Sequence, residues 1–214
     1  MQTIKEHIRL RVRWDLTILI LILITVLIIP FQIAFLHRVN LIGSIIIYSI
    51  DLFFLIDIIL NFRTSFRYAG EEITSSRELY RHYLRTDFKY DLIATLPFDA
   101  LFFLVPGLEW EGVSIILWFR LFRLIRIRRL FIIIHRWQNQ TWINPGYLQV
   151  FQFLFVMVIL AHIVACSWYF SSFVADFPAN CWMVLTGIAD SDVATQYIRS
   201  LYWTVTTLTT IGYG

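Results

Sequence analysis

The distribution of apolar residues along the chain predicts a series of membrane-spanning helices. Apolar stretches close to the roughly 20 residues that a helix needs to cross a bilayer recur along the sequence. Five spans are expected, at residues 14–36, 41–62, 88–105, 115–137 and 147–174. A sixth apolar stretch, residues 197–208, is too short to span, so it predicts a re-entrant helix that surrounding protein holds at membrane depth. The pattern predicts an all-α membrane protein.

Composition and charge add an orientation to this picture. Hydrophobic residues make up 58% of the chain and charged residues only 15%, against roughly 25% in an average soluble domain, which excludes an ordinary soluble protein. Lys and Arg concentrate before the first span and in residues 63–89, whereas the loops after the third and fifth spans are acidic. Because cytoplasmic loops carry the basic excess, we expect a multi-pass protein of the plasma membrane, or of the inner membrane of a bacterial cell, with a cytoplasmic N-terminus.

The fourth expected span carries an arginine at every third position. This arginine series consists of Arg120, Arg123, Arg126 and Arg129. One arginine at the centre of a membrane helix costs about 2.5–3.5 kcal/mol, so four that faced lipid would cost on the order of 10 kcal/mol. In an α-helix, steps of three rotate the stripe by about 60° each, whereas in a 3₁₀-helix the arginines align on one face. The sequence leaves these two geometries open.

Two simpler interpretations apply to these arginines. Arg128, Arg129 and Arg136 suit the cytoplasmic end of a helix, where long basic side chains reach the interface. Arg120 and Arg123 lie close to the acidic external loop, so this interpretation fails for them. A basic helix lying on the membrane is disfavoured because the polar stripe is narrow.

Aspartates in the other spans are the expected partners of the arginine series, since intramembrane carboxylates usually mark functional sites. These candidates are Asp51, Asp57, Asp91 and Asp99. On the second span, Phe54, Asp57 and Asn61 fall within about 60° of one another, so one face presents a ring, an acid and an amide. A moving guanidinium and a static ion-pair scaffold both fit this pattern. Three aspartates at helix ends are expected to cap helices or face solvent: Asp15, Asp87 and Asp99.

A buried arginine series with counter-charges is a device for coupling to membrane potential. Moving one elementary charge through the whole field is worth about 2.3 kcal/mol per 100 mV. Two or three effective charges per subunit of a tetramer would therefore supply on the order of 20 kcal/mol, which is enough to drive a conformational switch.

The last residues, 207–214, read TLTTIGYG and resemble the TVGYG selectivity filter of potassium channels, with Ile in place of Val. The filter residues so identified are Thr210, Ile211, Gly212, Tyr213 and Gly214. Successive backbone carbonyls replace the hydration shell of a cation in such a filter, so potassium is expected at Thr210, Ile211, Gly212 and Tyr213. Because one subunit supplies one strand of the filter, a homotetramer is expected.

Nearly the whole chain resembles the voltage-gated-like cation channels. Residues 51–64, 83–99 and 161–170 carry a narrower likeness to their cyclic-nucleotide-binding-domain family, which includes cyclic nucleotide-gated, hyperpolarisation-activated and ether-à-go-go-type channels. The resemblance implies that the arginine series senses voltage. It also implies a set of charge-transfer partners: Asp51, Phe54, Asp57 and Asp91. The GYG sequence resembles potassium-selective members, and the short leader suggests a prokaryotic one.

The same resemblance implies a division of the chain. We expect a cytoplasmic leader at 1–13, a four-helix voltage-sensor domain at 14–137, a short linker at 138–146 and a partial pore domain at 147–214. The pore domain would hold the fifth helix, an external loop, a re-entrant pore helix and the filter. The sixth helix, and a domain that binds a cyclic nucleotide (cAMP or cGMP), are expected outside this sequence; the nucleotide is implied by the family alone.

Other function classes find little support. No nucleophile–base–oxyanion set and no Gly-rich phosphate loop is visible, so neither an enzyme nor a nucleic-acid partner is expected. Two alternatives remain: a pore-less voltage sensor that conducts protons or serves an effector, and a ligand-gated channel whose sensor is static. His162 and Cys166 are spaced to bind metal but are expected to pack, and Cys166 and Cys181 are not expected to pair.

Overall fold

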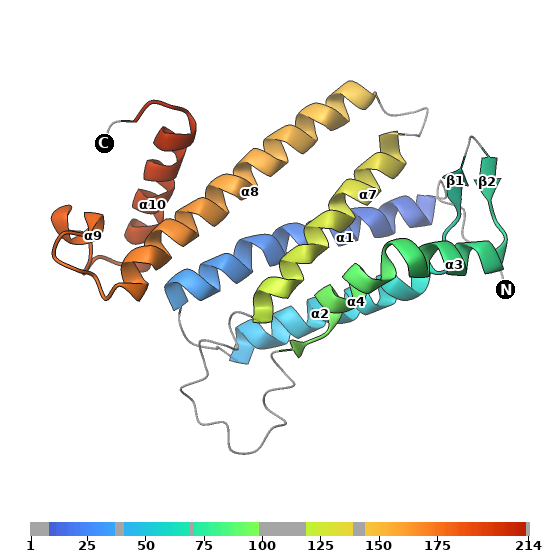
Figure 1. The fold of residues 1–214 in the computed structure, drawn as a ribbon, viewed down its shortest axis with the longest axis horizontal. Coiled ribbons are helices and arrows are strands. Elements are labelled where there is room, and N and C mark those ends of the chain that lie inside the picture. The colour runs from blue at the N-terminus through green and yellow to red at the C-terminus, as the bar shows by residue number, and fades with distance from the viewer. Residues whose placement is uncertain (1–8, 37–40, 69–70, 99–118, 139–143, 213–214) are drawn as a thin grey trace, which may run out of the picture. The chain divides into compact units, whose positions relative to one another are not determined.

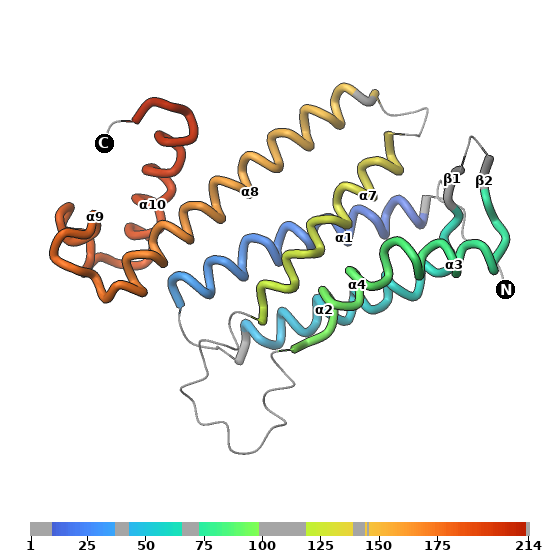
Figure 2. The backbone as a smooth tube through the Cα atoms, viewed as in Figure 1, coloured from blue at the N-terminus to red at the C-terminus, as the bar shows by residue number. Residues whose placement is uncertain are grey.

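The computed structural model describes residues 9–36, 41–68, 71–98, 119–138 and 144–212. Its contacts divide the chain into two compact units, which are described separately. Unit 1 comprises Met1–Val26 and Val39–Leu148, and unit 2 comprises Leu27–Arg38 and Gln149–Gly214. Figure 1 labels the helices and strands, and Figure 2 traces the same backbone as a tube.

The described residues form helices apart from one short pair of strands. In chain order the elements are α1 (Arg9–Phe31), the π-helix η1 (Gln32–Leu36), α2 (Leu41–Asn61), β1 (Phe66–Tyr68), β2 (Glu71–Ile73), α3 (Ser76–Thr86), α4 (Phe88–Thr95), the 3₁₀-helix η3 (Leu121–Arg126), α7 (Ile127–Gln138), α8 (Pro145–Val174), α9 (Trp182–Leu185) and α10 (Val193–Leu208). The strands are antiparallel, with Phe66 opposite Ile73. The sequence did not predict this hairpin or α3, but the all-α class is confirmed.

Among the described residues, three helices are long and apolar enough to cross a membrane: Leu10–Leu36, Gly43–Asn61 and Gly146–Val174. On α8, Tyr147 and Phe153 are largely exposed, as expected of a helix that meets lipid or another subunit. The expected spans at residues 88–105 and 115–137 run into residues 99–118, which lie outside the described part of the chain.

The first helix differs from the prediction at both ends. It begins at Arg9 instead of residue 14, so Arg11 lies inside the helix and is buried. Pro30 lies near its C-terminal end, where the missing N–H removes a helical hydrogen bond, and the chain continues as the π-helix η1. Ile33 and Phe35 on this π-turn are buried in unit 2.

In unit 1, α4 packs against α2, α3 and η3. An aromatic cluster fastens α3 to the end of α2: the ring of Phe62 stacks on Tyr80 at 5.0 Å between centroids and meets Tyr83 edge-on at 4.7 Å. Phe88 at the start of α4 completes the cluster, 5.5 Å from Phe62. The connection after α2 is therefore a packed part of the unit.

Unit 2 has its own apolar core between η1, α8 and the segment around α9. The buried core residues are Ala34, Phe35, Cys166, Tyr169, Met183 and Ile188. On α8, His162 Nδ1 lies 2.9 Å from the Tyr197 hydroxyl and its Nε2 lies 2.9 Å from the Leu27 carbonyl oxygen. Both ring nitrogens therefore have protein partners, which is a structural role. Cys166 and Cys181 are both free thiols.

Asp192 caps the N-terminus of α10. Its carboxylate accepts hydrogen bonds from the Thr195 backbone N–H at 3.2 Å and from the Thr195 hydroxyl at 2.6 Å. These bonds stabilise the charged form and lower the pKa of Asp192. The cap satisfies one of the helix donors that would otherwise have no partner.

Replacing Asp192 with alanine is therefore expected to lower the thermal stability of the protein at neutral pH. Because the pKa is lowered in the folded state, the stabilisation is present above the ordinary aspartate pKa and is lost as the pH falls through the lowered value. Unfolding curves of the variant and the wild type should converge in that acidic range. Asp190→Ala, in the same loop, is the matched control; an equal loss there would contradict the capping role.

Candidate functional site: a buried arginine–aspartate network

One face of α2 carries polar and aromatic residues at steps of three or four, which keeps them on the same side of the helix. These residues are Ser44, Tyr48, Asp51, Phe54, Asp57 and Asn61. Apart from Tyr48, which is half-buried, all of them are buried, whereas Leu52, Leu55 and Ile59 on other faces are exposed. The helix therefore presents a buried stripe of hydroxyl, carboxylate, ring and amide groups to its neighbours in unit 1.

The arginine series faces this stripe from η3 and the start of α7. Residues Leu121–Arg126 form a 3₁₀-helix, in which side chains at every third position align. The geometry that the sequence left open is therefore the 3₁₀ one as far as Arg126. The four guanidinium side chains belong to residues that are only 2–3% exposed. Their charges must be compensated inside the protein.

Asp51 receives two members of the series. Arg123 donates to its two oxygens from Nε at 3.2 Å and from Nη2 at 2.8 Å, and Arg126 donates to it from Nη2. The guanidinium carbon of Arg126 also lies 4.0 Å from the centre of the Phe54 ring. One arginine is therefore bound bidentately, while the next is shared between a carboxylate and an aromatic face.

The first and last arginines of the series bind α2 on either side of the Asp51 and Phe54 contacts. Arg120 Nη2 donates to the Ser44 hydroxyl at 3.3 Å, and Arg129 Nε donates to Asp57 at 3.0 Å. Successive arginines therefore meet successive groups along α2. Among the described residues, Arg126 Nε and Nη1 have no hydrogen-bond partner, so that guanidinium is only partly held.

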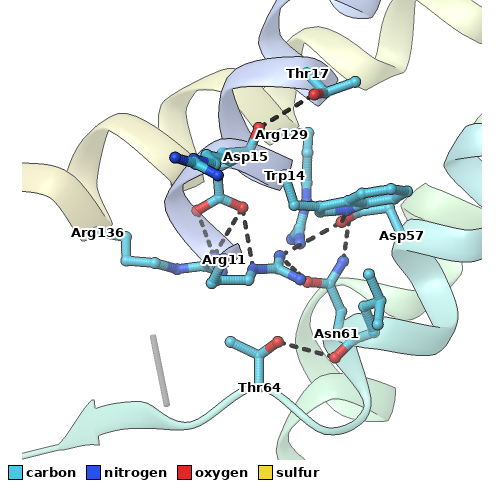
Figure 3. Close-up of polar contacts among 11 residues, drawn as sticks. Arg11, Trp14, Asp15, Thr17, Asp57, Asn61, Thr64, Arg129 and Arg136 are labelled. Atoms are coloured by element: carbon cyan, nitrogen blue, oxygen red, sulfur yellow. Dashed lines mark hydrogen bonds and ion pairs between the residues drawn. The ribbon is translucent and has the colours of Figure 1, made fainter. Parts of the chain in front are cut away.

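Asp57 is also the centre of a second group of charges, shown in Figure 3. We call this the inner cluster; it comprises Arg11, Trp14, Asp15, Asp57, Asn61, Arg129 and Arg136. Asp57 accepts hydrogen bonds from Trp14 Nε1 at 2.8 Å and from Asn61 Nδ2 at 2.9 Å. Arg11 Nη2 lies 3.4 Å from Asp57 and donates to the Asn61 oxygen at 2.8 Å. Asp57 is thus shared by arginines from α1 and α7.

The structure corrects the expectations for Asp15 and Arg136. Asp15 is fully buried and accepts from Arg136 Nη1 at 3.0 Å, with Arg11 Nε 3.1 Å away. Asp15 therefore neither caps a helix nor faces solvent. The Arg136 side chain is only 12% exposed, so it does not reach the interface. The reason is that α1 begins before Arg11, which brings Arg11 and Asp15 into the bundle.

Of the three aspartates expected around α4, the structure describes Asp87 and Asp91, which have different partners. Asp87 makes no side-chain capping bond at α4, so the capping alternative is wrong. It is partly exposed and binds Arg128 at 2.6 Å. Asp91 accepts a 2.6 Å hydrogen bond from the Tyr83 hydroxyl and lies within electrostatic reach of Arg129. Burial and the Asp91 carboxylate raise the pKa of Tyr83, so the hydroxyl keeps its proton and donates. Asp99 lies outside the described residues.

The motif at the end of α10 is described as far as Gly212. Thr210 has φ 60° and Gly212 has φ 58°, both in the left-handed region. The backbone N–H groups of Ile211 and Gly212 donate to the Thr206 carbonyl at 2.9 and 3.0 Å, which closes the C-terminus of α10. Tyr213 and Gly214 lie outside the described residues. The ring of Trp203 on α10 stacks on the ring of Trp168 on α8, with 3.8 Å between their centroids.

Several members of the network were missed from the sequence. Ser44, Tyr48, Trp14 and Tyr83 gave no signal beyond their positions, but Arg11 did. Arg11 and Asp15 are spaced i, i+4, the spacing of an ion pair on one helix face. Extending the first helix toward the N-terminus would have brought Arg11 into the site.

Sequence comparison finds similarity to known proteins along nearly the whole chain. The ion transport protein family matches residues 11–214. The potassium channel AKT2/3 of Arabidopsis thaliana is 28% identical over 94% of this chain, and the voltage-gated delayed rectifier potassium channel KCNH1 of Rattus norvegicus is 30% identical over 94%. The potassium/sodium hyperpolarization-activated cyclic nucleotide-gated channel 3 of Mus musculus is 30% identical over 95%.

The matched regions cover 25%, 23% and 29% of these three proteins, so the chain spans about a quarter of their length. The family match, in contrast, covers nearly the whole chain, and the membrane-length helices agree with it. The chain therefore belongs to the ion transport protein family, as a multi-pass membrane protein related to voltage-gated potassium channels of the cyclic-nucleotide-binding-domain group.

Proposed function

We propose that this chain is part of a subunit of a voltage-sensing, potassium-selective channel. The observation that carries the proposal is the register of the arginine series along α2: Arg123 and Arg126 on Asp51, Arg126 over the Phe54 ring and Arg129 on Asp57. In the proposed role these arginines are the sensing charges, and the charge-transfer partners are Asp51, Phe54, Asp57 and Asp91.

The 3₁₀ geometry supports movement along this stripe. Three residues of a 3₁₀-helix rise about 6 Å, so a shift of one step carries each arginine to the site its neighbour occupied. Arg126 is the member poised to move, because it already lies over Phe54 between the two carboxylates. A charge that crosses the field in this way couples the conformation to voltage at about 2.3 kcal/mol per 100 mV.

The remaining assignments extend the same proposal. Thr210–Gly214 would form one strand of the filter, with potassium at Thr210, Ile211, Gly212 and Tyr213, and four copies of the chain would complete it as a homotetramer. We further propose a cytoplasmic N-terminus in the plasma membrane, a sensor at 14–137 and a partial pore domain at 147–214. A relative named as cyclic nucleotide-gated supports modulation by cAMP or cGMP through a domain outside these residues.

The potassium assignment is tested by reversal potential. The full-length protein that contains this chain is reconstituted in liposomes, and currents are recorded under opposed potassium and sodium gradients. We expect the reversal potential to follow the potassium gradient. A reversal that ignores potassium and follows sodium equally would contradict the proposed filter.

A static sensor in a ligand-gated channel is the second candidate. The inner cluster favours it, because Arg11, Arg129 and Arg136 are all held by buried carboxylates in one arrangement. The two candidates differ in whether charge moves with voltage. A pore-less sensor is less well supported, because a sensor without a pore needs neither α8 and α10 nor the TIGYG sequence.

A further inference from the structure

The helix α3 has two opposed faces, and only one of them is used by the network described above. Leu79 and Tyr83 on its inner face are buried. On the opposite side, three arginines at steps of four form an exposed row, which we call the basic face of α3: Arg77, Arg81 and Arg85. This spacing keeps the three guanidinium groups along one line of the helix.

An apolar edge flanks the basic face. Tyr80 and Leu84 lie beside the arginines on the helix surface, and both remain exposed, Tyr80 to 54%. Within the described part of the chain, Arg77, Arg81 and Arg85 make no ion pair. Glu78 is the acidic residue of α3, so the helix has an excess of positive charge on its outer side.

The packing of α3 sets its position relative to the membrane. Phe62 directly follows Asn61, the last residue of a membrane-length helix, and its ring stacks on Tyr80 and meets Tyr83. The basic face is therefore fastened to the very end of a span, where the headgroups of a bilayer begin. An amphipathic helix with basic residues beside aromatic and aliphatic ones is suited to this interface.

We propose that the basic face of α3 binds the headgroup of an anionic phospholipid. Charge complementarity selects this occupant: three exposed guanidinium groups in one row match a phosphate with an added negative group, and the Tyr80–Leu84 edge would lie against the acyl chains. The basic excess of this loop agrees with the leaflet that carries anionic lipid. The proposal goes beyond channel function and does not depend on it.

A lipid bound here would sit next to the arginine network. Tyr83 is on α3, and its hydroxyl donates to Asp91, which lies within electrostatic reach of Arg129. The Tyr83→Phe variant removes this link without touching the basic face. It should therefore bind lipid as the wild type does.

Lipid binding is measured on the full-length protein in detergent, titrated with short-chain phosphatidylserine and followed by native mass spectrometry. Each basic residue near an anionic headgroup contributes about fivefold, so R77Q/R81Q/R85Q is expected to lose about a hundredfold in affinity. Glutamine is a good helix former, and an unchanged thermal unfolding curve verifies that α3 persists. Short-chain phosphatidylcholine should bind the wild type and this variant equally.

The matched control removes charge from exposed arginines of other helices, in R13Q/R199Q, and is compared with R77Q/R81Q, which removes the same charge from the basic face. The control should keep most of the phosphatidylserine affinity. An equal loss in this control, or undiminished binding by R77Q/R81Q/R85Q, would overturn the proposal. Competition by inorganic phosphate at the same concentration as the lipid would also overturn it, because the site would then bind free phosphate and not a lipid.

Discussion

Replacing Asp57 with alanine is expected to destabilise unit 1 by about 3–5 kcal/mol, the cost of leaving buried charge without its partner. Asp57 is buried and is shared by Arg129, Arg11, Trp14 and Asn61. Its loss takes from Arg129 the carboxylate to which it donates and leaves Arg11 with Asp15 as its remaining carboxylate partner. Thermal or denaturant unfolding of the detergent-solubilised full-length protein measures the effect.

Two comparisons separate this result from a general sensitivity to aspartate loss. Asp87→Ala removes a carboxylate from a partly exposed pair with Arg128, so it should cost only about 0–1 kcal/mol. In a double-mutant cycle, Asp57→Asn with Arg11→Gln should be less destabilising than the sum of the single changes, by about 0.5–3 kcal/mol. Additive effects would show that Arg11 and Asp57 are not coupled.

Replacing Gly212 with alanine is expected to abolish potassium-selective current while the charge movement of the sensor remains. Gly212 has φ 58°, and a left-handed conformation costs a residue with a Cβ roughly 1–2 kcal/mol. The space around it is open, so the backbone and not a clash is the cause. In the proposed homotetramer the distortion would be repeated four times around one axis. Ionic and gating currents recorded from the same cells measure both parts.

Gly187 provides the matched control for this change. It also has a left-handed backbone, with φ 68°, and has open space around its Cα. Gly187→Ala carries similar local strain in the loop after α9, outside residues 207–214. It should leave ion selectivity unchanged. Equal loss of selectivity in both variants would show that strain anywhere in unit 2 disturbs conduction, and the filter assignment would lose its support.

The sequence predicted the features of the site that repeat along a helix. Arginines at every third position identified the series, and the spacing of Phe54, Asp57 and Asn61 placed these three side chains on one face of the second span. The charge cost of arginine in a membrane then required carboxylate partners, and Asp51 and Asp57 are the ones found. Helix periodicity and the cost of burying a charge depend on the residues of one segment, so both can be inferred from the sequence.

Features that depend on how far a helix extends, or on contacts between distant elements, were not predictable in this way. The sequence places Arg11 in the leader at residues 1–13 and Asp15 at the end of the first span, so it does not predict the burial of either. The choice between α and 3₁₀ geometry near Arg123 also depends on contacts with α2. The spacing of residues within one helix does not predict such contacts. The packing of α3 through Phe62 is a third case.

The central claim is that the arginine series moves in the membrane field. It is tested most directly by the gating charge per channel of R120Q/R123Q, recorded beside Arg128→Gln, which removes one charge from a partly exposed position at the junction of η3 and α7. If the series moves, the double variant should lose up to about two elementary charges per subunit and the control should lose none. A gating charge that is unchanged in R120Q/R123Q would contradict it, and would make the network a static scaffold.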